Sequence, residues 1–283
     1  MLIQLESITN KPIKRVLEHI FYLLLILILI PVFIYFELCI VLPAVEKDKS
    51  KHVIHLCIAF FLLLNIVGNM IYGMLTDSSI KGKMLDSKQT SDWSLCSVCE
   101  CLRPPRAWHC NICNICILKR DHHCTYLTSC VGYFNYRYFI LLTLYIFIAM
   151  VYAFYYNLKF LATFISWNHG LAIIRFVFPL ANFVVDASYE SLYIFIVVIN
   201  FILALFTGFL AYYHFSNVFK GQTTPERKYN ECNYNKGWKR NLIEVFGVRW
   251  YLTWILPFIQ SPLPGDGIQW HDEDKSVFSS GFL

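Results

Sequence analysis

Cysteine and histidine residues gather in one short stretch of the chain, and their spacing is typical of a metal site. Most of the eleven cysteines lie between positions 96 and 130, in the order Cys96-x2-Cys99, His109-Cys110-x2-Cys113-x2-Cys116, Asp121-His122-His123-Cys124 and Cys130. A C-x2-C pair supplies two thiolates from one tight turn, and sulfur ligands combined with imidazole favour zinc over magnesium or calcium. In a reducing compartment this pattern predicts zinc binding rather than a disulfide framework.

The number of potential ligands exceeds what two zinc ions need. A closed structural zinc site takes four ligands. With Cys124 set aside, the six other motif cysteines, His109 and one histidine of the 122–123 pair fill two Cys3His sites. Asp121, one imidazole and Cys124 are then left over. A carboxylate, a base and a thiol are the parts of an activated cysteine nucleophile.

Two interpretations of these surplus residues stay open from spacing alone. Side chains alternate along a strand, so His122 and Cys124 would share one face, which favours His122 as the base and His123 as the ligand. In the alternative, Asp121 and His122 only support zinc, because a ligating imidazole usually donates to a carboxylate.

The elements that must position these residues are those of a membrane protein. Of the 283 residues, 57% are hydrophobic and 15% are charged, whereas soluble domains have about 25% charged residues. This composition excludes a soluble single-domain enzyme and a disordered chain. Four apolar stretches of 20 to 23 residues each, at 20–42, 53–75, 139–158 and 193–213, match the length that a bilayer core of about 30 Å requires. The predicted fold class is an all-α polytopic membrane protein with four transmembrane helices and a small cytosolic zinc-stabilised cysteine-rich domain.

The distribution of basic residues predicts the orientation of the chain. Of the 24 lysines and arginines, 19 lie in the N-terminus, in the segment between the second and third spans, and after residue 213. The positive-inside rule therefore predicts that these three segments are cytosolic. The expected parts are the N-terminus 1–19, helices 1 and 2 in 20–75, the zinc domain 76–137, helices 3 and 4 with a lumenal or interfacial loop in 138–215, and the tail 216–283.

Three smaller features complete this organisation. A shorter apolar stretch at 171–185 carries Arg175 and is predicted to be interfacial or re-entrant. No internal repeat is expected. The net charge of +5 is spread over several loops, which predicts contact with the membrane surface and no nucleic-acid partner.

Three motifs together resemble those of one enzyme family. From Cys96 to Phe139, over 44 residues, the cysteines and histidines combine with Arg103-Pro104, Arg106, Asp121-His122-His123-Cys124 and Asn135. This string resembles the cysteine-rich domain of the DHHC family of protein S-acyltransferases, the palmitoyltransferases. Thr223-Thr224-Pro225-Glu226 is similar to the TTxE motif of the family, and Gly237-x3-Asn241-x3-Val245-Phe246-Gly247 looks like its C-terminal segment.

The resemblance implies a role for each matching residue. Two structural zinc ions would be bound in interleaved sites, one by Cys96, Cys99, His109 and Cys116, the other by Cys110, Cys113, His123 and Cys130. Cys124 would be the nucleophile that takes the acyl group, His122 its general base, and Asp121 the residue that orients His122. Thr224 would lie against Asp121, and Asn241 would brace the C-terminal segment against the spans.

The resemblance also implies the reaction and its partners. Palmitoyl-CoA or another acyl-CoA would donate the acyl group, and cytosolic or membrane proteins with cysteines near the membrane would accept it. The expected location is the endoplasmic reticulum or Golgi membrane. Basic residues around the cluster are candidates for contacts with the CoA phosphates, with topology and anionic headgroups as the alternative role; they are Arg103, Arg106, Lys119, Arg120 and Arg137.

Three departures from the usual family pattern put the reaction rate and substrate choice in question. Thr125-Tyr126 follow Cys124 where Pro-Trp is common, Asp77-Ser78-Ser79 replace Asp-Pro-Gly, and Thr128-Ser129 replace a pair of asparagines. The main alternative function is therefore a catalytically inactive zinc-stabilised membrane scaffold. A zinc-dependent ubiquitin ligase fits the ligand spacing less well, and a transporter is disfavoured because the spans hold few ionisable residues.

Overall fold

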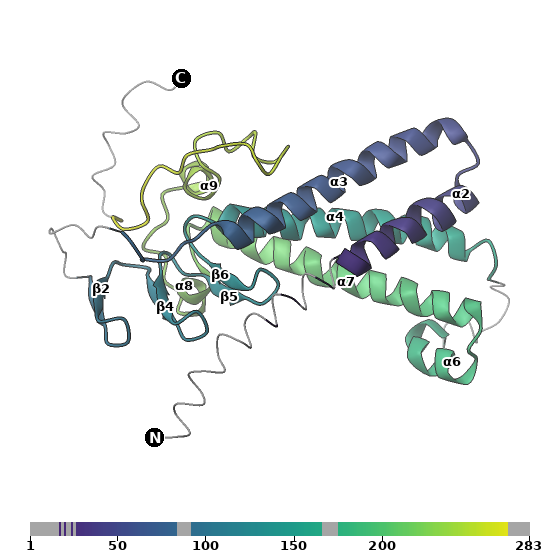
Figure 1. Cartoon of the computed structure of the whole chain (residues 1–283), viewed down its shortest axis with the longest axis horizontal. Helices are drawn as coiled ribbons and strands as arrows, with labels where there is room; N and C mark the ends of the chain where they lie inside the picture. Colours follow the sequence, from purple (N-terminus) through teal and green to yellow (C-terminus); the bar gives the residue numbers. More distant parts are fainter. Residues whose placement is uncertain are drawn as a thin grey trace. The chain divides into compact units, whose positions relative to one another are not determined.

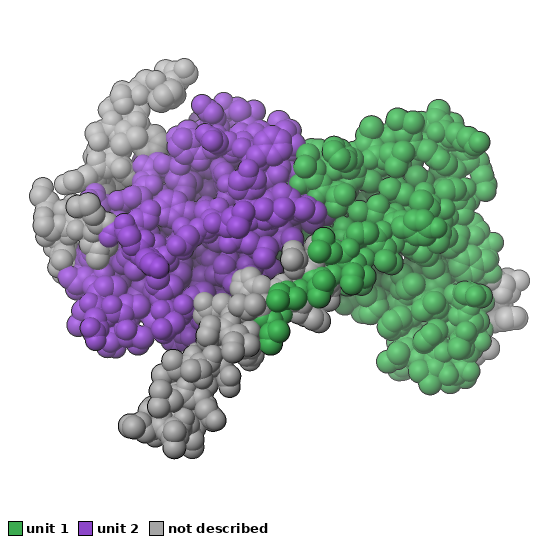
Figure 2. Space-filling view, viewed as in Figure 1, with its two compact units in different colours: residues 1–64, 143–211 green, residues 65–142, 212–283 purple. Residues whose placement is uncertain are grey.

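The structure is a computed structural model that describes residues 17, 20, 24, 27–83, 92–165 and 175–270. The chain divides into two compact units, formed by residues 1–64 with 143–211 and by residues 65–142 with 212–283 (Figure 2). Three long helices contribute residues to both units: α3 (Lys49–Leu75), α4 (Tyr136–Leu161) and α7 (Tyr189–Phe219).

Four helices among the described residues are long and apolar enough to cross a membrane. They are Leu27–Val45, which ends in the π-helix η1 (Phe36–Val41) and α2 (Leu42–Val45), and then α3, α4 and α7. The prediction of four spans with a small cysteine-rich region is confirmed. The helices continue beyond the predicted apolar limits, because backbone hydrogen bonding extends into the polar residues that flank an apolar stretch. Most of 20–26, at the start of the first predicted span, lies outside the described residues.

The first unit holds a polar cluster among apolar helices. The Asn157 side-chain amide of α4 donates to Glu37 Oε1 of η1 at 2.7 Å, and the Tyr193 hydroxyl of α7 donates to Asn157 Oδ1. Leu161, Ile194 and other apolar side chains pack around Tyr193. Hydrogen bonds of this kind satisfy polar groups that have no access to water.

The predicted fifth apolar stretch, 171–185, is described only in part. Its end forms the short helix α6 (Pro179–Val185), and 171–174 lie outside the described residues. Seven residues are too few to cross a bilayer. Its interfacial or re-entrant placement stays a prediction.

The second unit contains the cysteine-rich region as three small antiparallel hairpins. They are β1 (Ser94–Cys96) with β2 (Cys101–Arg103), β3 (Trp108–Cys110) with β4 (Ile115–Ile117), and β5 (His122–Cys124) with β6 (Ser129–Val131) (Figure 1). Two short helices follow the end of α7: α8 (Thr224–Lys228) and α9 (Trp238–Phe246). Strands of three residues bury little apolar surface, so other interactions must hold these hairpins in place.

Asn135, just before α4, ties the third hairpin to the end of α3. Its side-chain amide donates to the carbonyls of Gly73 at 3.1 Å and Cys130 at 2.9 Å, and its Oδ1 accepts from the Gly132 amide at 2.8 Å. The side chain has no exposed surface. This single residue therefore satisfies backbone groups on α3 and on β6 at once.

The Asp77-Ser78-Ser79 departure forms a well-bonded turn after α3. The Ser79 amide and hydroxyl donate to the Asp77 carboxylate at 2.7 and 2.8 Å, and the Ser78 hydroxyl donates to Asn135 Oδ1 at 3.2 Å. The Ser78 carbonyl accepts from the Leu118 amide at 2.9 Å. These side chains make a turn here without the usual proline and glycine.

The Thr128-Ser129 departure leaves a strained residue. Thr128 has φ of 51°, in the left-handed region, which is unfavourable for a β-branched residue and several-fold easier for asparagine. We expect Thr128→Asn to stabilise the protein by roughly 0.5–1 kcal/mol, measured by thermal unfolding in detergent. Thr128→Ala removes the hydroxyl but keeps a side chain in the left-handed region, and it should bring no such gain. Equal stability of the Asn variant and the natural protein would contradict the strain argument.

Candidate functional site

The three hairpins repeat at an interval of 14 residues. Cys96, Cys110 and Cys124 end the first strand of each hairpin, and they pair with Cys101, Ile115 and Ser129 in the same register. The left-handed residues Glu100, Asn114 and Thr128 also recur every 14 positions. The expectation of no internal repeat is therefore wrong here, because the repeat lies in backbone geometry and ligand positions rather than in overall sequence similarity.

Two clusters of four potential zinc ligands each join one hairpin to the next. The first cluster is Cys96, Cys99, His109 and Cys116, and the second, shifted by 14 residues, is Cys110, Cys113, His123 and Cys130; within each, all ligand atoms lie within 4.8 Å of one another. In the first, His109 Nδ1 is 3.2 to 4.0 Å from the three sulfurs. In the second, His123 Nδ1 is 3.3 to 3.7 Å from them.

These distances fit zinc. A tetrahedral ion with Zn–S bonds of about 2.3 Å and Zn–N bonds of about 2.05 Å places two sulfurs roughly 3.8 Å apart and a sulfur and a nitrogen roughly 3.6 Å apart. The observed sulfur–sulfur distances are 3.8 Å between Cys99 and Cys116 and 3.7 Å between Cys113 and Cys130. Each set is therefore consistent with a closed Cys3His zinc site.

The third repeat has a cysteine but no such cluster. Leu127 occupies the place that Cys99 and Cys113 have in the first two repeats. It is fully buried, and a methyl group built on Gly73 of α3 would lie 3.1 Å from its Cδ1. The third hairpin thus packs against α3 with an apolar side chain where the others offer a metal ligand. Cys124 stands where Cys96 and Cys110 stand, but outside both four-residue clusters.

Asp121 and His122 lie beside Cys124 in a buried hydrogen-bonded group. His122 Nδ1 is 2.7 Å from Asp121 Oδ2. Thr224, at the start of α8, donates its backbone N–H to Asp121 Oδ1 and its hydroxyl to Asp121 Oδ2, both at 2.8 Å. Asp121 is 3% exposed and Cys124 is 5% exposed. His123, between His122 and Cys124 on β5, belongs to the second cluster, as strand alternation predicts.

The charges of this group are mutually stabilised. Burial opposes ionisation of Asp121, but the hydrogen bonds with His122 and with the Thr224 backbone outweigh it and lower the Asp121 pKa. Burial alone would lower the His122 pKa, but hydrogen bonds with Asp121 and with Cys124 raise it to about 9. His122 can therefore take a proton from a thiol and hold it at neutral pH.

Comparison with known proteins shows which family this chain resembles. The family model of the DHHC palmitoyltransferases matches residues 89–231, half of the chain. The Rattus norvegicus protein named "Probable palmitoyltransferase ZDHHC24" is 34% identical over 227 residues, 78% of this chain and 79% of the relative. The Homo sapiens protein of the same name is 34% identical over 221 residues, 76% of this chain and 77% of the relative. The Xenopus laevis protein named "Palmitoyltransferase ZDHHC15" is 32% identical over 181 residues, 61% of this chain and 48% of the relative.

The chain belongs to the DHHC palmitoyltransferase family. The prediction of a protein S-acyltransferase is confirmed at this level, and so is the family resemblance. This palmitoyltransferase is a multi-pass membrane protein that uses acyl-CoA and modifies proteins. Family membership disfavours the scaffold, ubiquitin ligase and transporter alternatives.

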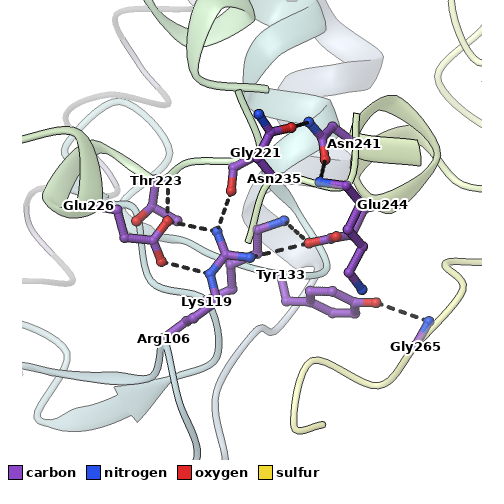
Figure 3. Close-up of polar contacts among 11 residues, drawn as sticks. Arg106, Lys119, Tyr133, Gly221, Thr223, Glu226, Asn235, Asn241, Glu244 and Gly265 are labelled. Atoms are coloured by element: carbon purple, nitrogen blue, oxygen red, sulfur yellow. Dashed lines mark hydrogen bonds and ion pairs between the residues drawn. The ribbon is translucent and has the colours of Figure 1, made fainter. Parts of the chain in front are cut away.

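A buried cluster of opposite charges connects the second hairpin of this palmitoyltransferase to α8 and α9. Arg106, whose side chain is 1% exposed, makes two parallel hydrogen bonds to the Glu226 carboxylate at 2.7 and 2.8 Å (Figure 3). Glu244 accepts from Lys119 Nζ at 2.7 Å and from Arg106 Nη1 at 3.4 Å. The Arg106 guanidinium also lies over the rings of Tyr234 and Trp270, 4.2 and 4.4 Å from their centroids.

This cluster corrects part of the predicted CoA-binding set. Arg106 and Lys119 are buried and paired with carboxylates, so they are not available to CoA phosphates. Arg120 lies beside the Cys110 and Cys130 sulfurs, a position suited to neutralising zinc-bound thiolates. Arg103 remains partly exposed, stacked 4.9 Å over the Trp108 ring. Arg137 donates to the Tyr138 hydroxyl and to the Ser261 and Ile259 carbonyls.

Asn241 lies where α9 meets the end of α7. Its side-chain amide donates to Asn235 Oδ1 at 2.8 Å (Figure 3). The same amide donates to the Phe219 carbonyl at 2.9 Å, and its Oδ1 accepts from the Lys236 amide at 3.0 Å. Phe219 is the last residue of α7, so Asn241 satisfies a carbonyl that has no partner within the helix.

Sequence reasoning missed the buried residues that contact this site from other elements. They are Glu226, Glu244 and His214, which come from α8, α9 and α7. Glu226 stood within the quoted TTxE-like motif, but its arginine partner is 120 positions away. His214 carried no spacing signal. Only burial of ionisable groups, visible in the fold, identifies them.

Zinc content tests the two clusters separately. We expect the purified protein to contain two zinc ions per chain, because each cluster has the four ligands of a closed site. Cys99→Ser and Cys113→Ser should each reduce the content to about one ion, measured by elemental analysis. Cys101→Ser changes a neighbouring thiol outside both clusters and should keep both ions. Full zinc content in either ligand variant would contradict the assignment.

The buried charge cluster predicts an asymmetric mutational effect. Glu244→Ala leaves Lys119 buried without its carboxylate and should destabilise the protein by roughly 3–5 kcal/mol. The double variant Glu244→Leu with Lys119→Met removes both charges and should recover most of that loss. Thermal unfolding in detergent measures both. A double variant no more stable than the single one would show that the lost charge pairing is not the cause.

The same cluster predicts how stability depends on pH. Burial opposes ionisation of Glu244, but the charges of Lys119 and Arg106 outweigh it and lower its pKa. The Glu244 contribution to stability is therefore present above the ordinary glutamate pKa of about 4.3 and is lost as pH falls through the lowered value. The Glu244→Leu, Lys119→Met variant should lose less stability than the natural protein over this acidic range.

Proposed function

We propose that Cys124 of this palmitoyltransferase carries the acyl group as a thioester during transfer. One observation carries the proposal: Cys124 occupies a ligand position of the hairpin repeat, lies outside both zinc clusters, and is next to a hydrogen-bonded pair of the buried Asp121 and the partly exposed His122. A thiol that binds no metal, beside a base held by a carboxylate, is equipped for nucleophilic attack.

Each residue of the group has a defined step. A free thiol, with a usual pKa of about 8.5, is mostly protonated at neutral pH. His122 takes the Cys124 proton, and the thiolate attacks the carbonyl carbon of the acyl-CoA thioester. The carbon–sulfur bond to CoA breaks, and the CoA sulfur receives the proton from His122. His122 then takes the proton of a cysteine thiol of the substrate protein, and the resulting thiolate attacks the acyl-Cys124 carbonyl carbon. The carbon–sulfur bond to Cys124 breaks, and Cys124 leaves as a thiolate beside protonated His122.

Asp121 and Thr224 support these steps without touching the acyl group. Asp121 binds His122 Nδ1, which leaves Nε2 for the Cys124 thiol. Thr224 contacts both oxygens of Asp121 and so restrains the carboxylate. The two zinc ions have a structural role in this proposal, because each cluster supplies four protein ligands and leaves no open position.

The location of the reaction follows from the predicted topology. We infer that both termini and residues 76–137 face the cytosol, as the distribution of basic residues favours. Cys124 precedes α4 by only 12 positions, so it would react near the membrane surface, where a water-soluble CoA and a buried acyl chain are both within reach.

Arg103 and Arg137 are the remaining candidates for CoA phosphates. The endoplasmic reticulum or Golgi is the proposed compartment, and proteins with cysteines near the membrane are the proposed substrates.

Intact-protein mass after incubation with palmitoyl-CoA tests the acyl-enzyme. The natural protein should gain the mass of one palmitoyl group, and hydroxylamine should remove it because the bond is a thioester. Cys124→Ser should gain no hydroxylamine-sensitive group. Cys101→Ser is the matched control, a nearby thiol outside the clusters, and it should be acylated like the natural protein. A labile adduct that persists in zinc-loaded Cys124→Ser would contradict the proposal.

A further inference from the structure

A second histidine lies against the Asp121–His122 pair. His214 belongs to α7, five residues before the helix ends at Phe219, and is 5% exposed. Its Nδ1 is 3.8 Å from Asp121 Oδ2. The His214 and His122 rings have centroids 5.5 Å apart. The sequence separates His214 from Asp121 by more than 90 residues, so only the fold brings them together.

Two aromatic residues of α4 hold the His214 ring. A hydrogen bond of 3.0 Å joins the Tyr136 hydroxyl and His214 Nδ1. The Phe139 ring lies 4.8 Å from both imidazoles, edge-on to each. His122 is therefore in contact with one histidine and one phenylalanine from two different helices, in addition to its hydrogen bond with Asp121.

The three polar residues are better suited to mutual positioning than to metal binding. Asp121, His122 and His214 have ligand atoms within 4.8 Å of one another. However, both Asp121 oxygens already accept hydrogen bonds, Oδ1 from the Thr224 backbone and Oδ2 from the Thr224 hydroxyl and His122. A metal ion would have to displace these donors. A carboxylate with three donors and a fourth polar atom nearby is instead a rigid support for a base.

We propose that His214 is a positioning residue for the acyl transfer. Its imidazole, held by Tyr136, restrains the Asp121 carboxylate through Nδ1 and the His122 ring through contact. This restraint keeps His122 Nε2 directed at Cys124 while acyl-CoA binds and CoA leaves. The proposal rests on the proposed roles of Asp121, His122 and Cys124, and it extends the support of the catalytic pair from the hairpin to two membrane helices.

Two substitutions separate the polar contact of His214 from its packing. His214→Phe keeps a ring in contact with Phe139 and His122 but removes Nδ1. His214→Asn loses the ring but places a polar atom of its amide near the position of Nδ1. Tyr136→Phe removes the partner hydroxyl and leaves His214 intact. Phe215→Leu, one residue further along α7 and stacked on Phe246 and Trp254 instead, is the control for general effects on the helix.

The measurement is single-turnover acylation of the full-length protein in detergent, followed by intact mass at several palmitoyl-CoA concentrations. We expect His214→Phe to lower the maximal rate by about tenfold to a hundredfold, with the half-saturating concentration changed by less than about twofold. His214→Asn should stay within about threefold of the natural rate, and Tyr136→Phe should fall between the two. Zinc content should remain at two ions per chain in all of them, and Phe215→Leu should react normally.

Distinct results would overturn this inference. A natural maximal rate in His214→Phe would show that His214 does not act on the catalytic pair. Equal losses in His214→Phe and His214→Asn would show that the polar contact is not responsible. If His214→Phe does not fold, a natural rate in Tyr136→Phe and a loss in His214→Asn would refute the proposal in the same way. Failure of the proposed function has a different signature, because there Cys124→Ser would still form the labile adduct.

Discussion

Tetrahedral metal coordination is the constraint on which the cysteine-rich region depends. Its strands have three residues each, and its buried positions include five cysteines and the charged residues Arg106 and Lys119. Such hairpins do not bury enough apolar surface to fold by themselves. Two sets of four ligands, offset by 14 residues, share the second hairpin and so connect all three. Because each set takes ligands from two neighbouring hairpins, a bound metal ion would hold those two hairpins together.

In the third hairpin of the repeat, a cysteine at a ligand position lies outside both four-residue clusters. This hairpin contributes His123 and Cys130 to the second cluster, and this places Cys124 where the other repeats have a ligand. Leu127 replaces the second cysteine of the pair and packs against α3. Zinc bound in the second cluster would therefore order the backbone around Cys124, while the Cys124 thiol lies outside both clusters. His122 on β5 and Asp121 just before it complete the group, and Thr224 of α8 is hydrogen-bonded to Asp121.

Buried charges join this region to the segments that follow the last span. Arg106 and Lys119 come from the hairpin region, and Glu226 and Glu244 come from α8 and α9. The same α8 that carries Glu226 begins with Thr224, which contacts Asp121. A carboxylate that binds a buried arginine in two parallel hydrogen bonds is held in a narrow range of positions. The ion pairs thus fix α8, and α8 in turn fixes Asp121. One short helix therefore contacts both the buried charges and Asp121.

The amino-acid sequence by itself determined the class of protein and the chemistry of its site. Apolar stretches of bilayer length predicted the four spans, and the spacing of cysteines and histidines predicted two zinc sites with a spare thiol, because both signals are local. Spacing could also favour His122 as the base and His123 as the zinc ligand, since the two residues lie on one short strand and their side chains alternate. It could not show that Arg106 and Lys119 are buried, because local composition does not distinguish an exposed basic residue from one paired with a carboxylate more than 100 positions away.

Tertiary structure alone decided which residues of distant elements meet at Asp121. The family resemblance implied that Thr224 lies against Asp121, and the structure shows that contact across 103 positions; His214, which approaches Asp121 from a membrane helix, was found only in the structure. Neither contact can be recognised from a periodic or local pattern in the sequence. Each depends on the path of α7, whose C-terminal end lies near the hairpins. The repeat of the hairpins was hidden for a related reason: three backbones with the same register carry different side chains at most positions. Sequence determines what each residue is able to do, and packing determines which of them meet.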